Sequence, residues 1–258
     1  MEQAHPQKGK ETVIRVENLE MGYGDTLVLR DVSFEIPKGE VFVIMGRSGC
    51  GKSTLLKHVI GLYRPRSGRI LYRGTDVWGV SEEERRTLMQ QIGVSYQQGA
   101  LLSSQTLAEN VAIPLREYTA FSREEIREIT EMKLALVGLR GMGEAMPSEL
   151  SGGMRKRAAL ARAMAMDPDV LFFDEPTAGL DPVTAARLDE LILEVSQALG
   201  TTVVMVTHEL DSIFGVGTDS IFLDGETKTI RGRGRPSRLL EDTEDPAVRR
   251  FLTRGERI

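Results

Sequence analysis

The segment 46–54 contains the residues whose types and spacing indicate chemistry most directly. Its sequence is Gly46-Arg47-Ser48-Gly49-Cys50-Gly51-Lys52-Ser53-Thr54. This fits the pattern G-x-x-x-x-G-K-[ST], in which glycines let several backbone N–H groups face one anion. A lysine at the place of Lys52 bridges the β- and γ-phosphates of a nucleotide, and a hydroxyl at the place of Ser53 binds Mg²⁺. We therefore predict a phosphate-binding loop that takes a nucleotide and Mg²⁺.

Such a loop needs a strand that ends before it and a helix that begins after it. Residues 41–45 form a continuous apolar run, which is typical of a buried strand, and residues 53–60 have the pattern of a helix. The helix N-terminus adds positive potential where the phosphates would lie. This context disfavours the alternative interpretation, a glycine-rich turn with a solvated lysine.

A pair of acids follows a second apolar run, residues 170–173. A carboxylate at a strand end can hold the Mg²⁺ that bridges nucleotide phosphates, a role that suits Asp174. Glu175 would point elsewhere and could polarise a water for attack on the γ-phosphate. Two such acids can also be simple helix caps, but downstream of a phosphate loop we favour the catalytic interpretation.

A second glycine motif precedes a predicted helix over residues 154–164. It reads Leu150-Ser151-Gly152-Gly153-Met154. A serine and two glycines at a helix N-terminus can form another anion site, and the alternative is a helix N-cap with a flexible lead-in. Because a simple NTPase needs only one phosphate-binding element, a second one in the same chain narrows the class of enzyme.

The flanking elements can be predicted as well. Residues 13–45 are β-rich, and Val32, Phe34 and Ile36 alternate with polar neighbours. Residues 101–164 have a helical character. Asp224-Gly225 predicts the turn of a small hairpin. Helix starts are predicted at Ser81 with Glu84, Ser122 with Glu125, Asp181 before Pro182, and Asp245 before Pro246.

In this order the motifs resemble those of the ABC-transporter ATPases. Residues 150–153 are similar to the signature motif of that family, residues 172–175 to its Walker B strand and residues 178–181 to its D-loop. Three single residues also match the family: the switch histidine is His208, the Q-loop glutamine is Gln97, and the aromatic residue that stacks on adenine is Tyr23. Gln98 is the neighbouring alternative to Gln97.

The resemblance implies a fold. We expect an α/β protein with a P-loop NTPase (RecA-like) core, an antiparallel β subdomain and an inserted α-helical subdomain at about 98–165. The ABC ATPase domain is expected at 13–240, after a flexible N-terminal segment at 1–12. A C-terminal tail with a short helix is expected at 241–258.

The resemblance also implies a mechanism with ATP and Mg²⁺. Two copies pair head to tail, so that the phosphate loop of one faces Ser151, Gly152 and Gly153 of the other. Glu175 is the expected general base and His208 contacts the γ-phosphate. The expected Mg²⁺ ligands are Ser53, Asp174 and Gln97, and the expected nucleotide contacts are Tyr23, residues 46–54, residues 151–153 and Asp181.

Composition limits the partners. The chain has 258 residues and a formal net charge of -5, which argues against a nucleic-acid surface. We interpret the basic clusters at 155–157 and 231–235 as solvated faces. No apolar run is long enough to span a bilayer, and residues 1–12 lack the apolar core of a signal peptide, so we expect a cytoplasmic location.

Cys50 is the only cysteine in the chain. Because it is surrounded by anion-binding N–H groups near Lys52, we expect a lowered thiol pKa. Alkylation should then block ATP hydrolysis, and ATP should slow the labelling.

Four segments resemble the ATPases of Mce/Mla-type phospholipid transporters: 97–101, 110–115, 152–160 and 245–252. Met154 stands where many ABC ATPases have glutamine, which favours this subfamily, whereas Leu102 departs from the usual aromatic residue. The resemblance implies a separate transmembrane permease that docks between Gln97 and the helical region, and a Mce-domain lipid-binding protein. The expected place is the cytoplasmic face of a bacterial inner membrane, with phospholipid moving between inner and outer membranes.

Two other functions remain open at this point. One is the ATPase of a small-solute importer, and the other is a soluble ABC ATPase, although the chain lacks the sustained heptads of a coiled-coil insertion. The short terminal helix either contacts a partner ATPase or accessory protein, or packs on its own domain.

Overall fold

The computed structural model describes residues 10–255. Residues 1–9 of the predicted N-terminal segment 1–12 therefore lie outside the described residues. The chain forms two compact units. The first combines the chain up to Met89 with the part that begins at Thr202, and the second is Gln90–Thr201. Among the described residues, none of the helices has the length and apolar character needed to cross a bilayer.

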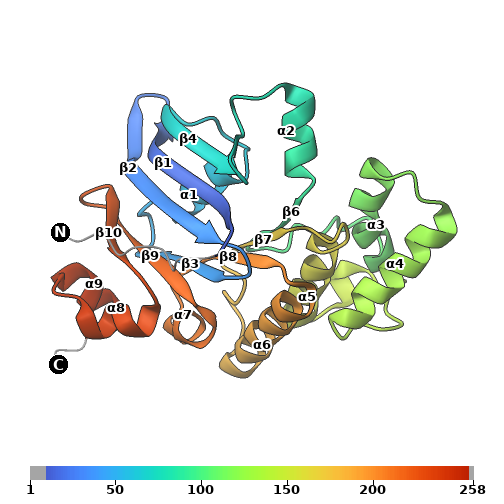
Figure 1. The fold of residues 1–258 in the computed structure, drawn as a ribbon. Helices are drawn as coiled ribbons and strands as arrows, with labels where there is room; N and C mark the ends of the chain where they lie inside the picture. The colour runs from blue at the N-terminus through green and yellow to red at the C-terminus, as the bar shows by residue number, and fades with distance from the viewer. Residues whose placement is uncertain (1–9, 256–258) are drawn as a thin grey trace. The chain divides into compact units, whose positions relative to one another are not determined.

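The first unit contains an antiparallel sheet with the strand order β2-β1-β4-β5 (Figure 1). This is the predicted β subdomain. Val32, Phe34 and Ile36 are buried, as their alternation predicts. The strands are β1 (Thr12–Tyr23), β2 (Thr26–Pro37), β4 (Ser67–Tyr72) and β5 (Thr75–Asp76).

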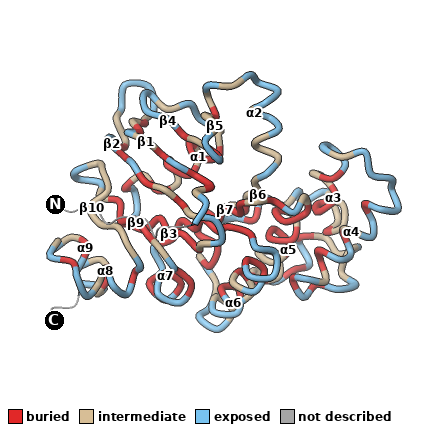
Figure 2. The backbone as a smooth tube through the Cα atoms, viewed as in Figure 1, coloured by how far each residue is buried: buried red, intermediate tan, exposed pale blue. Residues whose placement is uncertain are grey.

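The first unit also contributes a run of four strands in the order β10-β9-β3-β8. β3 pairs in parallel with both β8 and β9, and β3 and β8 are buried along their whole length (Figure 2). Continuous apolar runs are typical of parallel strands covered on both faces. These strands are β3 (Val41–Gly46), β8 (Thr202–Thr207), β9 (Asp219–Asp224) and β10 (Thr229–Arg233).

The helices that the structure describes in this unit lie between or after those strands. They are α1 (Lys52–Val59), α2 (Glu82–Met89), α7 (Leu210–Val216), α8 (Pro236–Asp242) and α9 (Pro246–Leu252). The terminal helix α9 packs on its own unit, because Val248 and Leu252 are buried in one cluster with Val43 and Met45 of β3. Asp245 caps α9 as predicted, with its Oδ1 accepting from the N–H of Ala247 at 2.8 Å.

The second unit contains two parallel strands, β6 (Ile92–Ser95) and β7 (Val170–Asp174), and helices around them. The helices are α3 (Leu107–Tyr118), α4 (Arg123–Leu136), the short 3₁₀ turn η1 (Pro147–Glu149), α5 (Gly152–Ala163) and α6 (Pro182–Leu199). Ser122 and Glu125 form the predicted capping box of α4, and Asp181 caps α6 with Pro182 in the first turn.

The buried face of α4 is not purely apolar. Lys133 is only 1% exposed and donates to Asp167 Oδ1, whereas Met132 and Leu136 are half exposed. Burial of a lysine on this face is possible because the loop before β7 supplies a carboxylate partner. The exposed methionine and leucine are therefore free of the core and available at the surface.

Candidate active site

The phosphate loop connects the end of β3 to the start of α1, as predicted. Gly51 is the N-cap residue of α1, with φ at 103°. A Cβ on Gly46 would lie 2.5 Å from the carbonyl oxygen of Leu223 and 2.7 Å from Cys50 Sγ. These positions require glycine because a side chain would collide with backbone or force a left-handed conformation.

Lys52 lies inside this loop. Its side chain is 6% exposed, and Nζ donates to the carbonyl oxygens of Gly46 at 2.9 Å and Arg47 at 3.3 Å. Arg47, Ser48 and Gly49 are exposed at the rim. An ammonium surrounded by a turn of backbone and a helix N-terminus makes a concave site suited to an anion.

Tyr23 lies at the end of β1 beside the loop. Its hydroxyl shares a hydrogen bond of 3.3 Å with Thr54 Oγ1, and 47% of the residue is exposed. Tyr63 meets the Tyr23 ring edge-on, with 5.8 Å between the ring centres. Sequence reasoning missed Tyr63, although an aromatic residue soon after α1 was an available signal.

His208 follows β8 at the same edge as the phosphate loop. Thr207 of β8 pairs with Met45 of β3. His208 and Gly46 are the next residues along these two parallel strands, so they lie at the same edge of the sheet. The His208 ring is half exposed, and its Nε2 lies 3.6 Å from Glu209 Oε1. The structure thus brings His208, Lys52 and Tyr23 to one side of the first unit.

Cys50 corrects the expectation of an activated thiol. The residue is 4% exposed, and burial raises its pKa more than the nearby Lys52 lowers it. The prediction of a lowered pKa is wrong because the sequence could not reveal how closely Gly46 and the β9–β10 turn cover the sulfur.

In the second unit, Gln97, Asp174 and Glu175 lie at one edge of the β6–β7 pair. Ser95 pairs with Phe173, so all three residues follow soon after paired positions. Asp174 and Glu175 are 9% exposed, and the Gln97 side chain is exposed. Glu175 has φ at 50°, a left-handed conformation that is uncommon outside glycine.

The signature residues meet the D-loop within this unit. Ser151 caps α5 by accepting from the N–H of Met154 at 3.3 Å. A Cβ on Gly153 would lie 2.6 Å from Thr184 Cγ2, so only glycine allows this approach of α5 to α6. Asp181 is exposed, and its hydrogen bonds with Thr184 hold the pKa of that carboxyl below its usual range.

The basic cluster at 155–157 is only partly the solvated face we expected, because Arg155 is exposed whereas Lys156 and Arg157 are half-buried. All three side chains donate to backbone carbonyls: Arg155 to Leu150 at 2.5 Å, Arg157 to Val137 at 3.4 Å, and Lys156 to both Gln97 and Glu175. The cluster at 231–235 also differs, because Arg231 pairs with Asp245 and Arg233 lies 3.8 Å from Asp219. Packing against distant segments gives these cations partners that a local pattern cannot reveal.

The predicted Mg²⁺ ligands stay a prediction, and the structure places them in two different units. The three side chains that we predicted as Mg²⁺ ligands, Ser53 in the first unit and Asp174 and Gln97 in the second, carry oxygen donors of the type that Mg²⁺ prefers. Within residues 10–255, His, Cys, Asp and Glu form no group of three that could hold a metal ion by themselves.

Comparison with known proteins decides the family. The family described as ABC transporter matches residues 29–178, more than half of the chain. The chain belongs to the ABC transporter family. As an ABC ATPase of a transporter, it is an enzyme that hydrolyses ATP.

Two kinds of ABC protein are among the similar relatives. "Probable ribonucleotide transport ATP-binding protein mkl" of Mycobacterium leprae is 42% identical over 95% of this chain and 70% of its own length. "Intermembrane phospholipid transport system ATP-binding protein MlaF" is 39% identical in Haemophilus influenzae, over 95% of this chain and 92% of that protein. The Escherichia coli MlaF is also 39% identical, over 89% of this chain and 84% of that protein.

Solved ABC proteins share the fold. The cbiO1 protein of Clostridium perfringens, part of the cbiONQ transporter complex, has a TM-score of 0.82 at 29% identity and covers 90% of this chain and 92% of its own. The dimeric cassette MJ0796 bound to ADP and phosphate has a TM-score of 0.75 at 29% identity and covers 86% of this chain and 98% of its own. These matches confirm the predicted P-loop NTPase fold of an ABC ATPase.

Proposed function

We propose that this ABC ATPase powers phospholipid transport between the inner and outer membranes of a bacterial envelope. The observation that carries the proposal is 39% identity to MlaF over 92% of the Haemophilus influenzae protein. Met154, directly after the two signature glycines, supports the same subfamily.

The residues have distinct roles in hydrolysis. Lys52 and the backbone N–H groups of residues 46–54 bind the phosphates, while Tyr23 stacks on the adenine. Glu175 accepts a proton from the attacking water, and Gln97 orients that water. His208 donates to the γ-phosphate as charge develops on it.

Mg²⁺ supplies charge neutralisation of the phosphate oxygens when it is bound. Ser53, Asp174 and Gln97 would hold it. The oxygen donors of these side chains support this assignment.

Two copies of the chain form the hydrolytic unit. The phosphate loop of each copy takes its ATP together with Ser151, Gly152 and Gly153 of the other, and Asp181 lies at the same interface. Two facts support this proposal: Ser151 and Asp181 are exposed, and the related cassette MJ0796 forms dimers.

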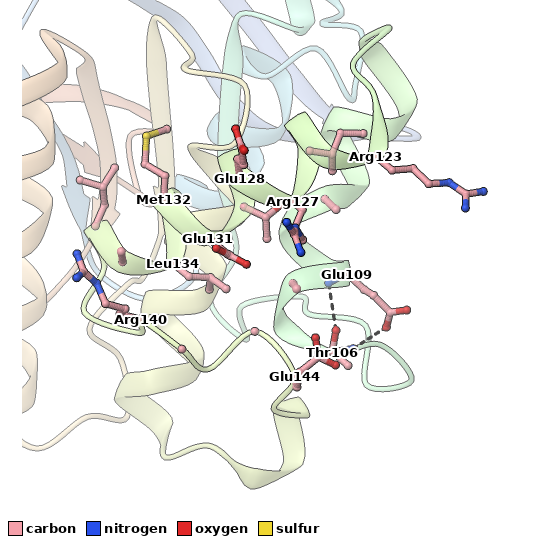
Figure 3. A pocket seen from close by; sticks show the side chains of 18 of the residues that line it. Thr106, Glu109, Arg123, Arg127, Glu128, Glu131, Met132, Leu134, Arg140 and Glu144 are labelled. Atoms are coloured by element: carbon pink, nitrogen blue, oxygen red, sulfur yellow. Dashed lines mark hydrogen bonds between the residues drawn. The ribbon is translucent and has the colours of Figure 1, made fainter.

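A transmembrane permease docks between Gln97 and the helical region, on the helical part of the second unit. A cleft of about 1160 Å³ lies there, and Figure 3 shows it surrounded by side chains of α3, α4 and the following loop. The half-exposed Met132 and Leu136 line it together with charged residues such as Arg127 and Glu131. Apolar side chains within a charged rim support a protein-binding surface.

The remaining partner is a Mce-domain lipid-binding protein, and the place is the cytoplasmic face of the inner membrane. The segments 97–101, 110–115, 152–160 and 245–252, which resemble the ATPases of Mce/Mla-type transporters, support both assignments. The MlaF relatives are named for an intermembrane phospholipid transport system, which agrees with transport between membranes. The acidic net charge of -5 supports the absence of a nucleic-acid partner.

A second candidate is the ATPase of a small-solute transporter. The 42% identity to mkl, named for ribonucleotide transport, favours it. In that case the ATPase chemistry is unchanged and only the permease and the substrate differ.

Partner capture separates these candidates. Tagged protein with Glu175→Gln, which holds the ATP-bound dimer, is purified from detergent-solubilised native membranes, and partners are identified by mass spectrometry. A multispan permease with a Mce-domain protein supports phospholipid transport. A permease with a soluble solute-binding protein supports the second candidate, and the absence of any membrane partner contradicts both.

A further inference from the structure

Lys156 connects two parts of the proposed catalytic machinery through one ammonium group. Its Nζ donates to the carbonyl oxygen of Glu175 at 3.2 Å and also to that of Gln97. Lys156 lies in the second turn of α5, the helix that begins at the signature glycines. One side chain therefore joins the signature helix, the glutamine loop and the segment after β7.

A second cation of α5 holds the rest of the glutamine loop. Arg162 donates to the carbonyl oxygens of Gly99 at 3.0 Å and Ala100 at 2.6 Å. A Cβ on Gly99 would lie 3.4 Å from Ala159 Cβ, so the loop backbone runs close against the helix. The backbone of residues 97–100 is thus fixed to α5, while the Gln97 side chain remains exposed.

The conformation of Glu175 needs such support. Its φ of 50° is a region that residues with a Cβ seldom occupy, and such a conformation persists only when the surroundings hold it. The hydrogen bond from Lys156 reaches the carbonyl of this residue. The same carbonyl also accepts from the N–H of Ala178 at 3.3 Å, so Lys156 supplies one of two hydrogen bonds that hold the backbone here.

Electrostatics agree with this placement. The carboxylates of Glu175 and Asp174 attract the Lys156 ammonium electrostatically. The ammonium is half-buried beside two carboxylates, a position that a solvated surface lysine does not take.

We propose that Lys156 is a positioning residue for ATP hydrolysis, which links the backbone at Gln97 to the backbone of the general base Glu175. This inference rests on the roles of Gln97 and Glu175 in the proposed function. A shift of the glutamine loop then changes the position of Glu175 through the shared ammonium. Lys156 itself touches neither ATP nor the attacking water.

The test compares three variants of the full chain in steady-state ATP hydrolysis, with ATP affinity measured separately by a fluorescent analogue. Lys156→Met removes both hydrogen bonds, and we expect kcat to fall by about 10- to 100-fold with ATP affinity within about twofold of wild type. Lys156→Arg keeps a cation with several donors and should recover most of kcat. Arg187→Met, an exposed cation on α6 of the same unit, is the matched control and should leave both quantities unchanged.

A merely structural role for Lys156 gives a different result. In that case Lys156→Met lowers kcat and ATP affinity together with the melting temperature, and Lys156→Arg does not restore kcat. Either that pattern or wild-type kcat in Lys156→Met overturns the proposal.

A double-mutant cycle tests the link itself. If Lys156 acts by holding Gln97 in place, Gln97→Ala costs less in the Lys156→Met background than in wild type. Additive losses in kcat overturn the link.

Glu175→Gln separates this inference from the proposed function. An active Glu175→Gln enzyme overturns the assigned role of Glu175 and the Lys156 inference with it. An inactive Glu175→Gln together with a fully active Lys156→Met overturns the Lys156 inference alone.

Discussion

Cys50 and Lys52 are neighbours in the phosphate loop, and both are buried for different reasons. Lys52 is covered by the loop itself, whose carbonyl oxygens accept from its ammonium. Cys50 is covered by the β9–β10 turn, because a Cβ on Gly225 would lie 3.3 Å from the Cα of Cys50. The same short motif therefore places a cation among backbone carbonyls and hides its thiol.

Native Cys50 should react slowly with an alkylating reagent. Because its pKa is raised, less thiolate is present at a given pH, and the thiolate is the reacting form. We expect iodoacetamide labelling, followed by mass spectrometry, to be slower in the native chain than in urea. The rate should still rise with pH where a free cysteine, with its usual pKa of 9.0, has levelled off. Equal rates in the native and unfolded chain would contradict the burial of this thiol.

Tyr23 gives a second prediction at the residue scale. Because stacking on a base contributes about 1–3 kcal/mol, Tyr23→Ala should weaken ATP binding by that amount. Tyr23→Phe keeps the ring and loses only the hydrogen bond with Thr54, so it should bind ATP nearly as the wild type does. Titration with a fluorescent nucleotide measures the ATP affinity of both variants. A similar loss of affinity in the two variants would show that the hydroxyl, and not the ring, contributes to ATP binding.

At the scale of elements, α9 is fixed by its N-cap and its buried face. Asp245 accepts from backbone N–H groups of α9 through Oδ1, and its Oδ2 accepts from Arg231 Nε at 2.7 Å. Val248 and Leu252 bury the apolar face of the helix. The cap and the apolar contacts thus act together on a helix of only 7 residues.

Removal of this cap should destabilise the first unit. Asp245→Ala should lower the free energy of unfolding by about 1 kcal/mol from the cap alone, with a small addition from the lost ion pair. Urea denaturation of Asp245→Ala beside Glu244→Ala, an exposed acid one residue earlier, measures the difference. Equal stability of the two variants would mean that α9 does not depend on its cap.

At the scale of the whole molecule, the central prediction is an ATP-dependent dimer. Glu175→Gln with ATP and Mg²⁺ should elute as a dimer with twice the 28.6 kDa mass of one chain, because ATP then persists at the interface. Light scattering coupled to size exclusion measures the mass.

A matched pair of variants tests where the dimer forms. In the Glu175→Gln background, Ser151→Arg should abolish the dimer because it places a bulky side chain at the signature motif. Ser81→Arg removes a comparable exposed N-cap at α2 and should leave the dimer intact. Loss of the dimer in both variants would assign the effect to helix capping instead of the interface.

Local motifs account for the parts of the molecule that could be predicted. The phosphate loop, the caps at Ser122 and Asp181, and the alternation in β2 each depend on residues close together in the chain. Backbone conformation over such short spans follows from glycine, capping hydrogen bonds and hydrophobic periodicity. The order of the motifs then indicated an ABC ATPase.

The sequence alone therefore determined the family, the glycine-rich loop before α1 and the two acids at the end of β7, because each is encoded in contiguous residues. Only the tertiary structure decided the burial of Cys50, the buried Lys133 of α4, and the contacts of Lys156 with carbonyls 59 and 19 positions away along the chain. The burial of a side chain and the choice of its hydrogen-bond partner depend on which distant segments pack together. The residues next to a charged side chain in the sequence do not indicate which backbone carbonyl will accept its hydrogen bonds.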